Sequence, residues 1–243
     1  MIKKNILFLI PARKGSKGLK NKNLRMLGDK PLILYSTDFA KSVCNNNDII
    51  CVSTNDEKVI DLCLRNQISV PFLRPENISD DFSTSYDVIK HAIQFYEKNK
   101  IYFKFIMLLQ PTSPFRLQND FFEIEKKTKN KNFDMIVSVK KSKDSPYFNQ
   151  FIEGDYNNLI PVIEGNKKYS RRQDSPNVFS YNGAFYLIRV KSFISNKDLN
   201  FKNILKLEMP NWRSIDIDNI DDLDLAKMYL NKFHENCKNN PKT

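Results

Sequence analysis

The chain has 243 residues, of which 41% are hydrophobic, and a formal net charge of +11. This length suits one large α/β domain or a domain with an appendage, and the hydrophobic content is sufficient for a core. No apolar run approaches the roughly 20 residues of a membrane span, so we expect no membrane partner. The charge suits a polyanionic ligand and non-specific attraction to nucleic acid equally well.

The chain starts MIKKNILFLIPARKG, with the lysines and apolar stretch of a secretory signal. The stretch is short and runs into charged residues without a small-residue cleavage site, which indicates a first strand instead. The four cysteines, Cys44, Cys51, Cys63 and Cys237, show neither CxxC nor metal-ligand spacing. This usage is typical of buried, reduced thiols and predicts a cytoplasmic protein.

Strand-like and helix-like segments alternate, which predicts an α/β fold with a mostly parallel central sheet and helices on both faces. Ile6–Ile10 is a nearly continuous apolar run, as in a strand buried on both faces. Further strands are expected at Asp48–Ser53, Ser69–Leu73, Lys104–Leu109, Phe133–Val139, Asn182–Val190 and Ile204–Met209. Helices are expected at Lys30–Val43, Glu57–Asn66, Tyr86–Glu97, Asp120–Lys129 and Asp221–Phe233.

Residues 140–180 break this alternation, because aromatic, proline and charged residues mix there without a period. A stretch of this length without regular structure is often an excursion from the core fold. We therefore divide the chain into an α/β domain of residues 1–139 and 181–234, an arm of residues 140–180, and a loose polar tail of residues 235–243.

A basic loop follows the first strand. It carries the cations Arg13, Lys14, Lys17, Lys20 and Lys22 and the glycines Gly15 and Gly18. Glycines let backbone N–H groups approach phosphate oxygens, and arginine and lysine supply charge, so the loop is suited to a polyphosphate. It matches neither GxGxxG nor GxxxxGK[ST], and a solvated basic loop remains the alternative.

The same stretch, PAR-x-GSKGL-x-x-KN, resembles the opening motif of the N-acylneuraminate cytidylyltransferases, which activate sialic acid and related nine-carbon acidic sugars. Four later motifs extend the resemblance over most of the chain. It implies a Rossmann-like nucleotidyltransferase fold and a reaction in which CTP and a nonulosonic acid give the CMP-sugar and pyrophosphate. In the family this loop holds the CTP phosphates. Arg13 and Lys17 would then neutralise charge as pyrophosphate leaves, and Lys22 and Asn23 also match family positions.

The second motif is Leu73-Arg74-Pro75 at the end of an expected strand, where an open sheet binds ligands. Seen alone, Arg74 is better explained as a surface ion-pair partner, but the family has LRP near the nucleotide. Ser83 follows in a cluster that would cap the next helix. A family serine that meets the nucleotide lies near this position.

The third motif, Leu109-Gln-Pro-Thr-Ser-Pro-Phe-Arg116, has two prolines that stiffen the loop. Gln110, Thr112 and Ser113 would offer hydrogen bonds to a sugar with many hydroxyls. The match to the family's LQPTSPxR separates this family from relatives that activate the eight-carbon sugar 3-deoxy-manno-octulosonate.

The fourth motif joins Arg172 and Gln173 to Asn182, matching the family's RQ-x-x-P and NGA-x-Y. Arginine suits the sugar carboxylate. A solvated basic turn is the alternative for Arg172. In the family this stretch lies on a dimerisation arm. The resemblance therefore implies a homodimer, in which Arg172 serves its own or the partner's site.

The fifth motif is Ser214-Ile-Asp216-Ile-Asp218. Alternate residues of an extended segment point to one side, and two carboxylates form an oxygen-rich site suited to Mg²⁺ (or Mn²⁺). Asp218 could instead cap the following helix, whose first-turn acids would satisfy the helix dipole. The family's DID segment favours the metal role for Asp216 and Asp218.

The sugar stays open between N-acetylneuraminate and legionaminate types. Some family members carry a lysine near Phe148 and an arginine near Ser180, whereas Ser145–Phe148 reads SPYF here and resembles relatives that activate legionaminic acid. Another nucleotidyltransferase with a different acidic sugar is an alternative. A nucleic-acid-binding module is suggested only by charge, and no reader motif supports it, so we expect no nucleic-acid partner.

Overall fold

The structure is a computed structural model that describes residues 1–15, 18–129, 132–163, 169 and 171–238. Within this part of the chain, six strands form the main sheet in the order β10-β6-β9-β5-β1-β4. They are β1 (Ile2–Pro11), β4 (Ile49–Ser53), β5 (Ile101–Leu108), β6 (Met135–Lys141), β9 (Phe179–Arg189) and β10 (Ile204–Glu208). Neighbouring strands are parallel except at β9, which is antiparallel to β5 and β6. The predicted mostly parallel sheet is confirmed.

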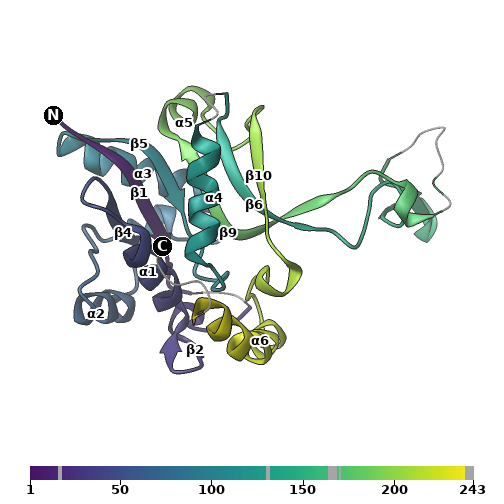
Figure 1. Cartoon of the computed structure of the whole chain (residues 1–243), viewed down its shortest axis with the longest axis horizontal. Coiled ribbons are helices and arrows are strands. Elements are labelled where there is room, and N and C mark those ends of the chain that lie inside the picture. Colours follow the sequence, from purple (N-terminus) through teal and green to yellow (C-terminus); the bar gives the residue numbers. More distant parts are fainter. Residues whose placement is uncertain (16–17, 130–131, 164–168, 170, 239–243) are drawn as a thin grey trace.

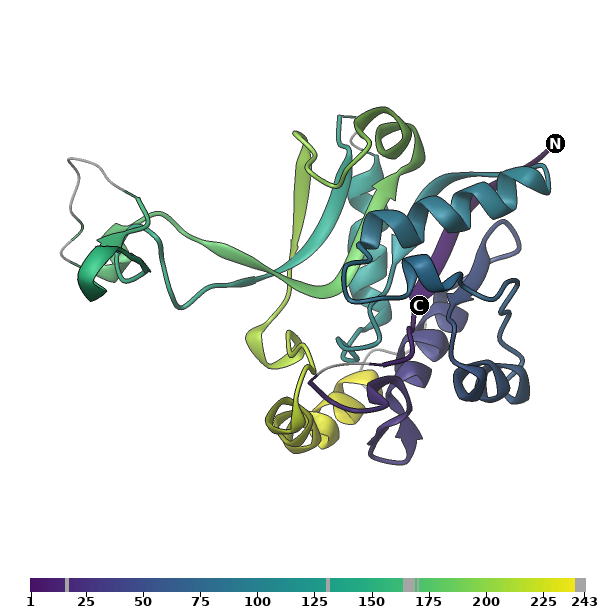
Figure 2. The ribbon, with the colours of Figure 1, turned by 180° about the vertical axis from the view of Figure 1, so that it is seen from behind.

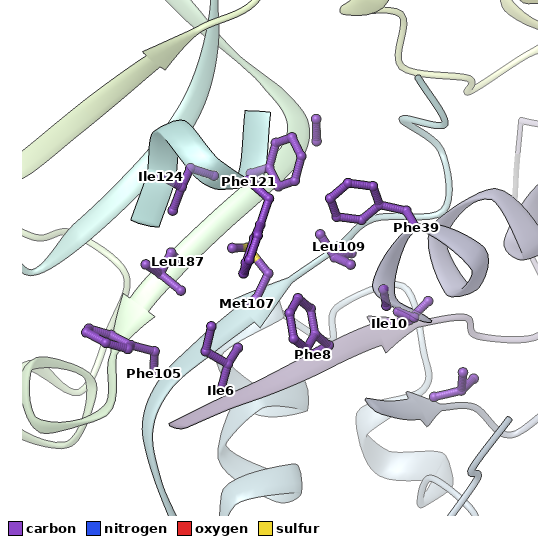
Figure 3. Close-up of a cluster of buried hydrophobic side chains, with 14 of the residues drawn as sticks. Ile6, Phe8, Ile10, Phe39, Phe105, Met107, Leu109, Phe121, Ile124 and Leu187 are labelled. Atoms are coloured by element: carbon purple, nitrogen blue, oxygen red, sulfur yellow. The ribbon is translucent and has the colours of Figure 1, made fainter. Parts of the chain in front are cut away.

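Helices cover both faces of the sheet, as predicted. They are α1 (Leu32–Val43), α2 (Glu57–Arg65), α3 (Ser85–Lys98), α4 (Gln118–Thr128), α5 (Val190–Asn196) and α6 (Ile220–Lys238). Alternate residues of β1 point to opposite faces: Ile6, Phe8 and Ile10 pack with side chains of α1, α2 and α4 (Figure 3). Leu7 and Leu9 pack with side chains of α3 on the other face. Figure 1 views the sheet from the α4 side and Figure 2 from the α3 side.

Several element boundaries differ from the sequence prediction. The prediction of a strand at Ser69–Leu73 is wrong. The described segment forms a single β-bridge, between Thr54 and Leu73, and otherwise meets β4 through isolated backbone hydrogen bonds. The helix predicted from Lys30 begins at Leu32, since Lys30–Pro31 is β3 and pairs with β2 (Met26–Leu27).

The C-terminal helix and the cysteines also differ from expectation. α6 continues to Lys238, past the predicted end at Phe233, and residues 239–243 lie outside the described residues. Cys51 and Cys63 are buried, as expected, but Cys44 is half-buried and Cys237 is exposed.

An arm leaves the sheet through β6 and β9, whose ends extend away from the helices (Figures 1 and 2). At its tip, β7 (Phe151–Glu153) pairs antiparallel with β8 (Leu159–Pro161). At its base, Lys141 pairs with Phe179, and the Ser142 N–H donates to the Val178 carbonyl at 2.9 Å. The two ends of the arm are therefore held side by side.

Candidate active site

A cleft of about 460 Å³ opens where β1 and β5 end. The chain after β1 reaches β4 on one side of it, while β5 lies on the other, and such switch points bind ligands in open α/β sheets. The cleft is lined by Pro11, Arg13, Gly18, Lys22, Asn23, Arg74, Ser83, Thr84, Ser85, Val88, Leu108, Gln110, Pro111, Thr112, Asp216 and Asp218. Four of the five sequence motifs thus meet in one cavity.

Arg74 is the most unusual side chain of this cleft. It is only 3% exposed, and its Nε and Nη2 atoms are buried with no hydrogen-bond partner among the described residues. Its backbone N–H donates to the Thr54 carbonyl at 2.8 Å, which fixes its position. Burial, helped by the charge of Arg13, lowers the pKa of Arg74 to about 10, so the group stays charged at neutral pH. A buried, unpaired cation is costly, and an anionic ligand would satisfy it.

The other described cations of the cleft have carboxylate partners. Arg13 Nη2 lies 2.6 Å from Asp81 Oδ1, and Lys22 Nζ lies 2.7 Å from Asp218 Oδ1. Asn23 donates from Nδ2 to the Arg13 carbonyl at 3.2 Å, which steadies the basic loop. Lys17 lies outside the described residues. Gly18 packs so closely that a Cβ there would clash with the Asp218 carbonyl.

The segment that carries the two aspartates is anchored to the loop after β5. The Ile217 N–H donates to the Thr112 carbonyl at 2.9 Å, and the Thr112 side chain hydrogen-bonds to Asp216. Burial among protein atoms raises the pKa of Asp216, and the charge of Asp218 adds to this, although the Asp216 side chain still faces the open cleft. Asn219, rather than Asp218, caps α6, since its Oδ1 accepts the Asp222 N–H at 3.0 Å.

The carboxylates of Asp216 and Asp218 suit a metal ion that is held jointly by the protein and a bound ligand. The described residues contain no group of three or more His, Cys, Asp or Glu side chains that could cage a metal ion alone. Mg²⁺ is usually held by one or two carboxylates together with substrate phosphates. Asp216 and Asp218, side by side on one wall of the cleft, supply the protein half of such a site.

Gln110 and Thr112 line the cleft, whereas Ser113 of the same motif is buried and donates to the Asn182 carbonyl at 2.9 Å. Asn182 is also buried: its Oδ1 accepts Ser138 Oγ at 2.5 Å, and its Nδ2 donates to Ser214 Oγ at 2.9 Å. Ser113 and Asn182 therefore join β6, β9 and the loops beside the cleft without lining it.

Gly183 and Arg116 were not among the predicted site residues, yet both position the Gln110 loop. Gly183 has a φ of +75°, and a Cβ there would lie 2.5 Å from Gln110 Oε1. Arg116 is buried, and it donates from Nε to the Ala184 carbonyl at 2.6 Å and from Nη2 to the Gln110 carbonyl at 2.7 Å. The motif LQPTSPFR ends in this arginine, but the motif does not indicate which carbonyls its side chain meets.

Ser83 lines the cleft, and so do its neighbours Thr84 and Ser85, which were not among the predicted site residues. Thr84 is the cap of α3, accepting the Asp87 N–H in a capping box. Gln173 instead lines a separate hollow on the arm, and the Arg172 side chain lies outside the described part of the structure. Within one chain, the fourth motif is thus divided between the arm and the core of the sheet.

The geometry agrees with comparisons to known proteins. Residues 7–236 match the sequence profile of a family described as cytidylyltransferase. The chain belongs to the cytidylyltransferase family. Among relatives, an N-acylneuraminate cytidylyltransferase of Streptococcus agalactiae serotype III is 33% identical over 217 residues, which make up 88% of this chain and 50% of that protein. The chain therefore spans about half the length of that curated relative.

The chain is also similar to a second curated relative and to a solved structure. A CMP-N,N'-diacetyllegionaminic acid synthase of Legionella pneumophila is 32% identical over 197 residues, covering 79% of this chain and 81% of that protein. The solved structure of a CMP:2-keto-3-deoxy-manno-octonic acid synthetase complexed with CTP superposes with a TM-score of 0.68 at 15% identity, covering 94% of this chain and 99% of that chain. At that identity the likeness shows the fold, and it agrees with the predicted nucleotidyltransferase architecture.

Proposed function

We propose that this protein transfers CMP from CTP to the anomeric hydroxyl of a nonulosonic acid and releases pyrophosphate. The observation that carries the proposal is the buried guanidinium of Arg74, two of whose nitrogens have no hydrogen-bond partner among the described residues, in a cleft that also presents Arg13 and Lys22. The start of α3 opens into the same cleft through Ser83, and a helix N-terminus favours anions. Family membership and the two relatives above support cytidine as the base.

In this reaction the sugar hydroxyl attacks the α-phosphorus of CTP, the bond from that phosphorus to the departing pyrophosphate breaks, and the hydroxyl proton would pass to a carboxylate of the Asp216–Asp218 pair. Arg13, Lys22 and, from the sequence motif, Lys17 would neutralise the charge that grows on the leaving group. Gln110 and Thr112, on the rigid loop held by Arg116, would orient the sugar hydroxyls.

Asp216 and Asp218 would hold Mg²⁺ or Mn²⁺, which would supply further charge neutralisation at the phosphate oxygens. The ion pair between Asp218 and Lys22 supports this role, because it shows that the carboxylate already faces a cation in the cleft.

We further propose a homodimer formed through the arm. The tip of the arm exposes a group of large apolar side chains: Tyr147, Phe148, Phe151, Ile152, Tyr156, Leu159, Ile160, Val162 and Ile163. So many large apolar side chains exposed on one short segment favour an interface there. A partner's arm would bring Arg172 and Gln173 to a sugar bound beside the cleft, where Arg172 could clasp the carboxylate.

The sugar is proposed to be of the N-acetylneuraminate or legionaminate type, because Tyr147 and Phe148 would offer an aromatic surface suited to acyl groups if the arm of a partner brings them to the sugar. Free cysteines support a cytoplasmic location. Among the described helices, none combines the length and apolarity that crossing a bilayer requires.

The deciding experiment measures pyrophosphate release from CTP with N-acetylneuraminate, N,N'-diacetyllegionaminate and 3-deoxy-manno-octulosonate. We expect release with at least one nine-carbon sugar and little with the eight-carbon sugar. Replacing CTP with UTP or ATP is the matched control for the base. Single-stranded nucleic-acid binding without sugar-dependent release would overturn the proposal and favour the nucleic-acid alternative.

A further inference from the structure

The ion pair between Arg13 and Asp81 joins two loops at the cleft. Arg13 follows β1, and Asp81 lies 68 positions later, just before α3. Arg13 Nη2 and Asp81 Oδ1 are 2.6 Å apart, and about one third of each side chain is exposed. The carboxylate thus approaches the guanidinium as closely as a ligand oxygen would in a charge-assisted hydrogen bond.

The charges of the cleft indicate a role for the ion pair between Arg13 and Asp81. Arg13 and Arg74 repel each other, since the charge of Arg13 contributes to the lowered pKa of Arg74. Arg74 has two nitrogens without a partner, so no acid of the described residues hydrogen-bonds to them. Among the described residues, Asp81 is the carboxylate that pairs with Arg13 and offsets its charge.

Asp81 is also carried on a well-formed turn. Asp80 Oδ1 accepts the Phe82 N–H at 3.0 Å and the Ser83 hydroxyl at 2.6 Å. The turn continues directly into the capping box of α3 at Thr84. The Asp81 carboxylate is therefore presented to Arg13 by a fixed backbone, while Ser83 of the same turn lines the cleft.

We propose that Asp81 is an internal stand-in for a ligand phosphate: it occupies Arg13 in the empty enzyme, yields to the phosphates of CTP, and returns to Arg13 as pyrophosphate leaves. This inference rests on the proposed function for the identity of the phosphate ligand. A phosphate and a carboxylate that share the Arg13 guanidinium carry the same sign of charge and repel each other, so binding of either is weakened by the other. Asp81 then sets how tightly the cleft holds polyphosphates and how readily it releases them.

The test compares wild type, Asp81→Asn and Asp81→Ala by calorimetric titration with inorganic pyrophosphate and, separately, with CTP. Because the ion pair is partly exposed, we expect roughly three- to tenfold tighter pyrophosphate binding in both variants. Product inhibition by pyrophosphate should strengthen by the same factor. Asp61→Asn removes an exposed acid from α2 and is the control for a general change of charge; it should change affinity less than twofold.

A double-mutant cycle separates competition for Arg13 from other effects of Asp81. In an Arg13→Gln background, Asp81→Asn should no longer tighten pyrophosphate binding. Unchanged or weaker binding in both folded Asp81 variants would overturn the inference while leaving the cytidylyltransferase proposal intact. Conversely, tighter pyrophosphate binding in the variants, with no sugar-dependent release from CTP in wild type, would support the role of Asp81 and overturn the proposed function.

Discussion

In β1, the four consecutive side chains from Leu7 to Ile10 are fully buried, whereas every residue of the arm strands β7 and β8 is exposed. Both regions are rich in isoleucine, leucine and phenylalanine. The sheet uses these residues for its own core, between helices on two faces. The arm has no covering layer in the described chain, so its apolar side chains can be buried only by another surface.

The sheet region and the arm are therefore expected to have different roles. The charged groups of the cleft are positioned by loops that the sheet fixes, as with the Ile217–Thr112 backbone bond. Changes in the sheet region should therefore affect stability and chemistry. Changes in the arm should affect assembly and sugar choice, while leaving CTP binding in place.

The largest effect is expected from breaking the buried pair of Arg213 and Asp120. Their side chains are each about 10% exposed, and two guanidinium nitrogens face the two carboxylate oxygens. Arg213→Ala should lower the free energy of unfolding by about 3–5 kcal/mol, because it leaves a buried carboxylate without its partner. Urea denaturation measures this. Lys227→Ala, which breaks an exposed pair with Asp224, is the control and should cost under about 1 kcal/mol. A loss below that level for Arg213→Ala would contradict the expectation.

The next effect is on turnover. Asp218→Asn should lower kcat by on the order of a hundredfold, because it removes one of two carboxylates proposed to hold the divalent cation. Circular dichroism and CTP titration should show an intact fold and cleft. Asp221→Asn, in the first turn of α6 and outside the cleft lining, is the matched control. Normal turnover of Asp218→Asn in excess chelator would exclude the metal role.

The arm gives the sharpest test of the comparison. Residues 143–177 can be replaced with a short turn, because Ser142 and Val178 already lie side by side. The shortened protein should be a monomer that still binds CTP but has little activity, because it lacks the proposed dimer contact. The double change Ile152→Asp and Leu159→Asp should weaken dimerisation at least tenfold, since each places a charge on exposed apolar surface. Sedimentation measures both.

Ile194→Asp, at an exposed apolar position on α5, is the control for the arm and should leave the association state unchanged. If the full-length protein sediments as a monomer at assay concentration, the arm is not a dimerisation element.

The smallest effect concerns sugar choice. Phe148→Lys should shift the ratio of kcat/KM for N,N'-diacetyllegionaminate over N-acetylneuraminate several-fold toward neuraminate. One apolar contact discriminates by about 1–3 kcal/mol, and Phe148 is partly exposed. Tyr102→Lys, at an exposed aromatic in β5, should leave the ratio unchanged. A wild type that already prefers neuraminate a hundredfold would refute the aromatic-wall interpretation.

The sequence predicted the sheet well where apolar runs are continuous, as at Ile6–Ile10, but it did not reveal the direction of β9. A strand buried on both faces reads the same whichever way it runs. The direction follows from the arm, which returns the chain beside the strand it left, so that β6 and β9 form an antiparallel pair.

For the site, the sequence motifs singled out Arg13, Arg74 and Asp216, and the structure brings all three to one cleft although they are far apart in the chain. Supporting contacts were not predictable in this way. The bond from Arg116 to the Ala184 carbonyl spans 68 positions, and nothing local indicates which carbonyl a buried arginine will meet. Asp81 carried no signal either, because an acid before a helix is ordinary.

The adjacent ends of the arm have a consequence for how such enzymes could diversify. Lys141 of β6 pairs with Phe179 of β9, so the arm is the connection between two strands whose ends are already adjacent. The entropy of closing a loop grows only slowly with its length when the ends are already in place. Arms of different sequence could therefore be exchanged between family members without redesigning the sheet. A chimera that carries a relative's arm on this chain is expected to fold, and its kcat/KM for the two sugars would test whether sugar choice moves with the arm, as we propose.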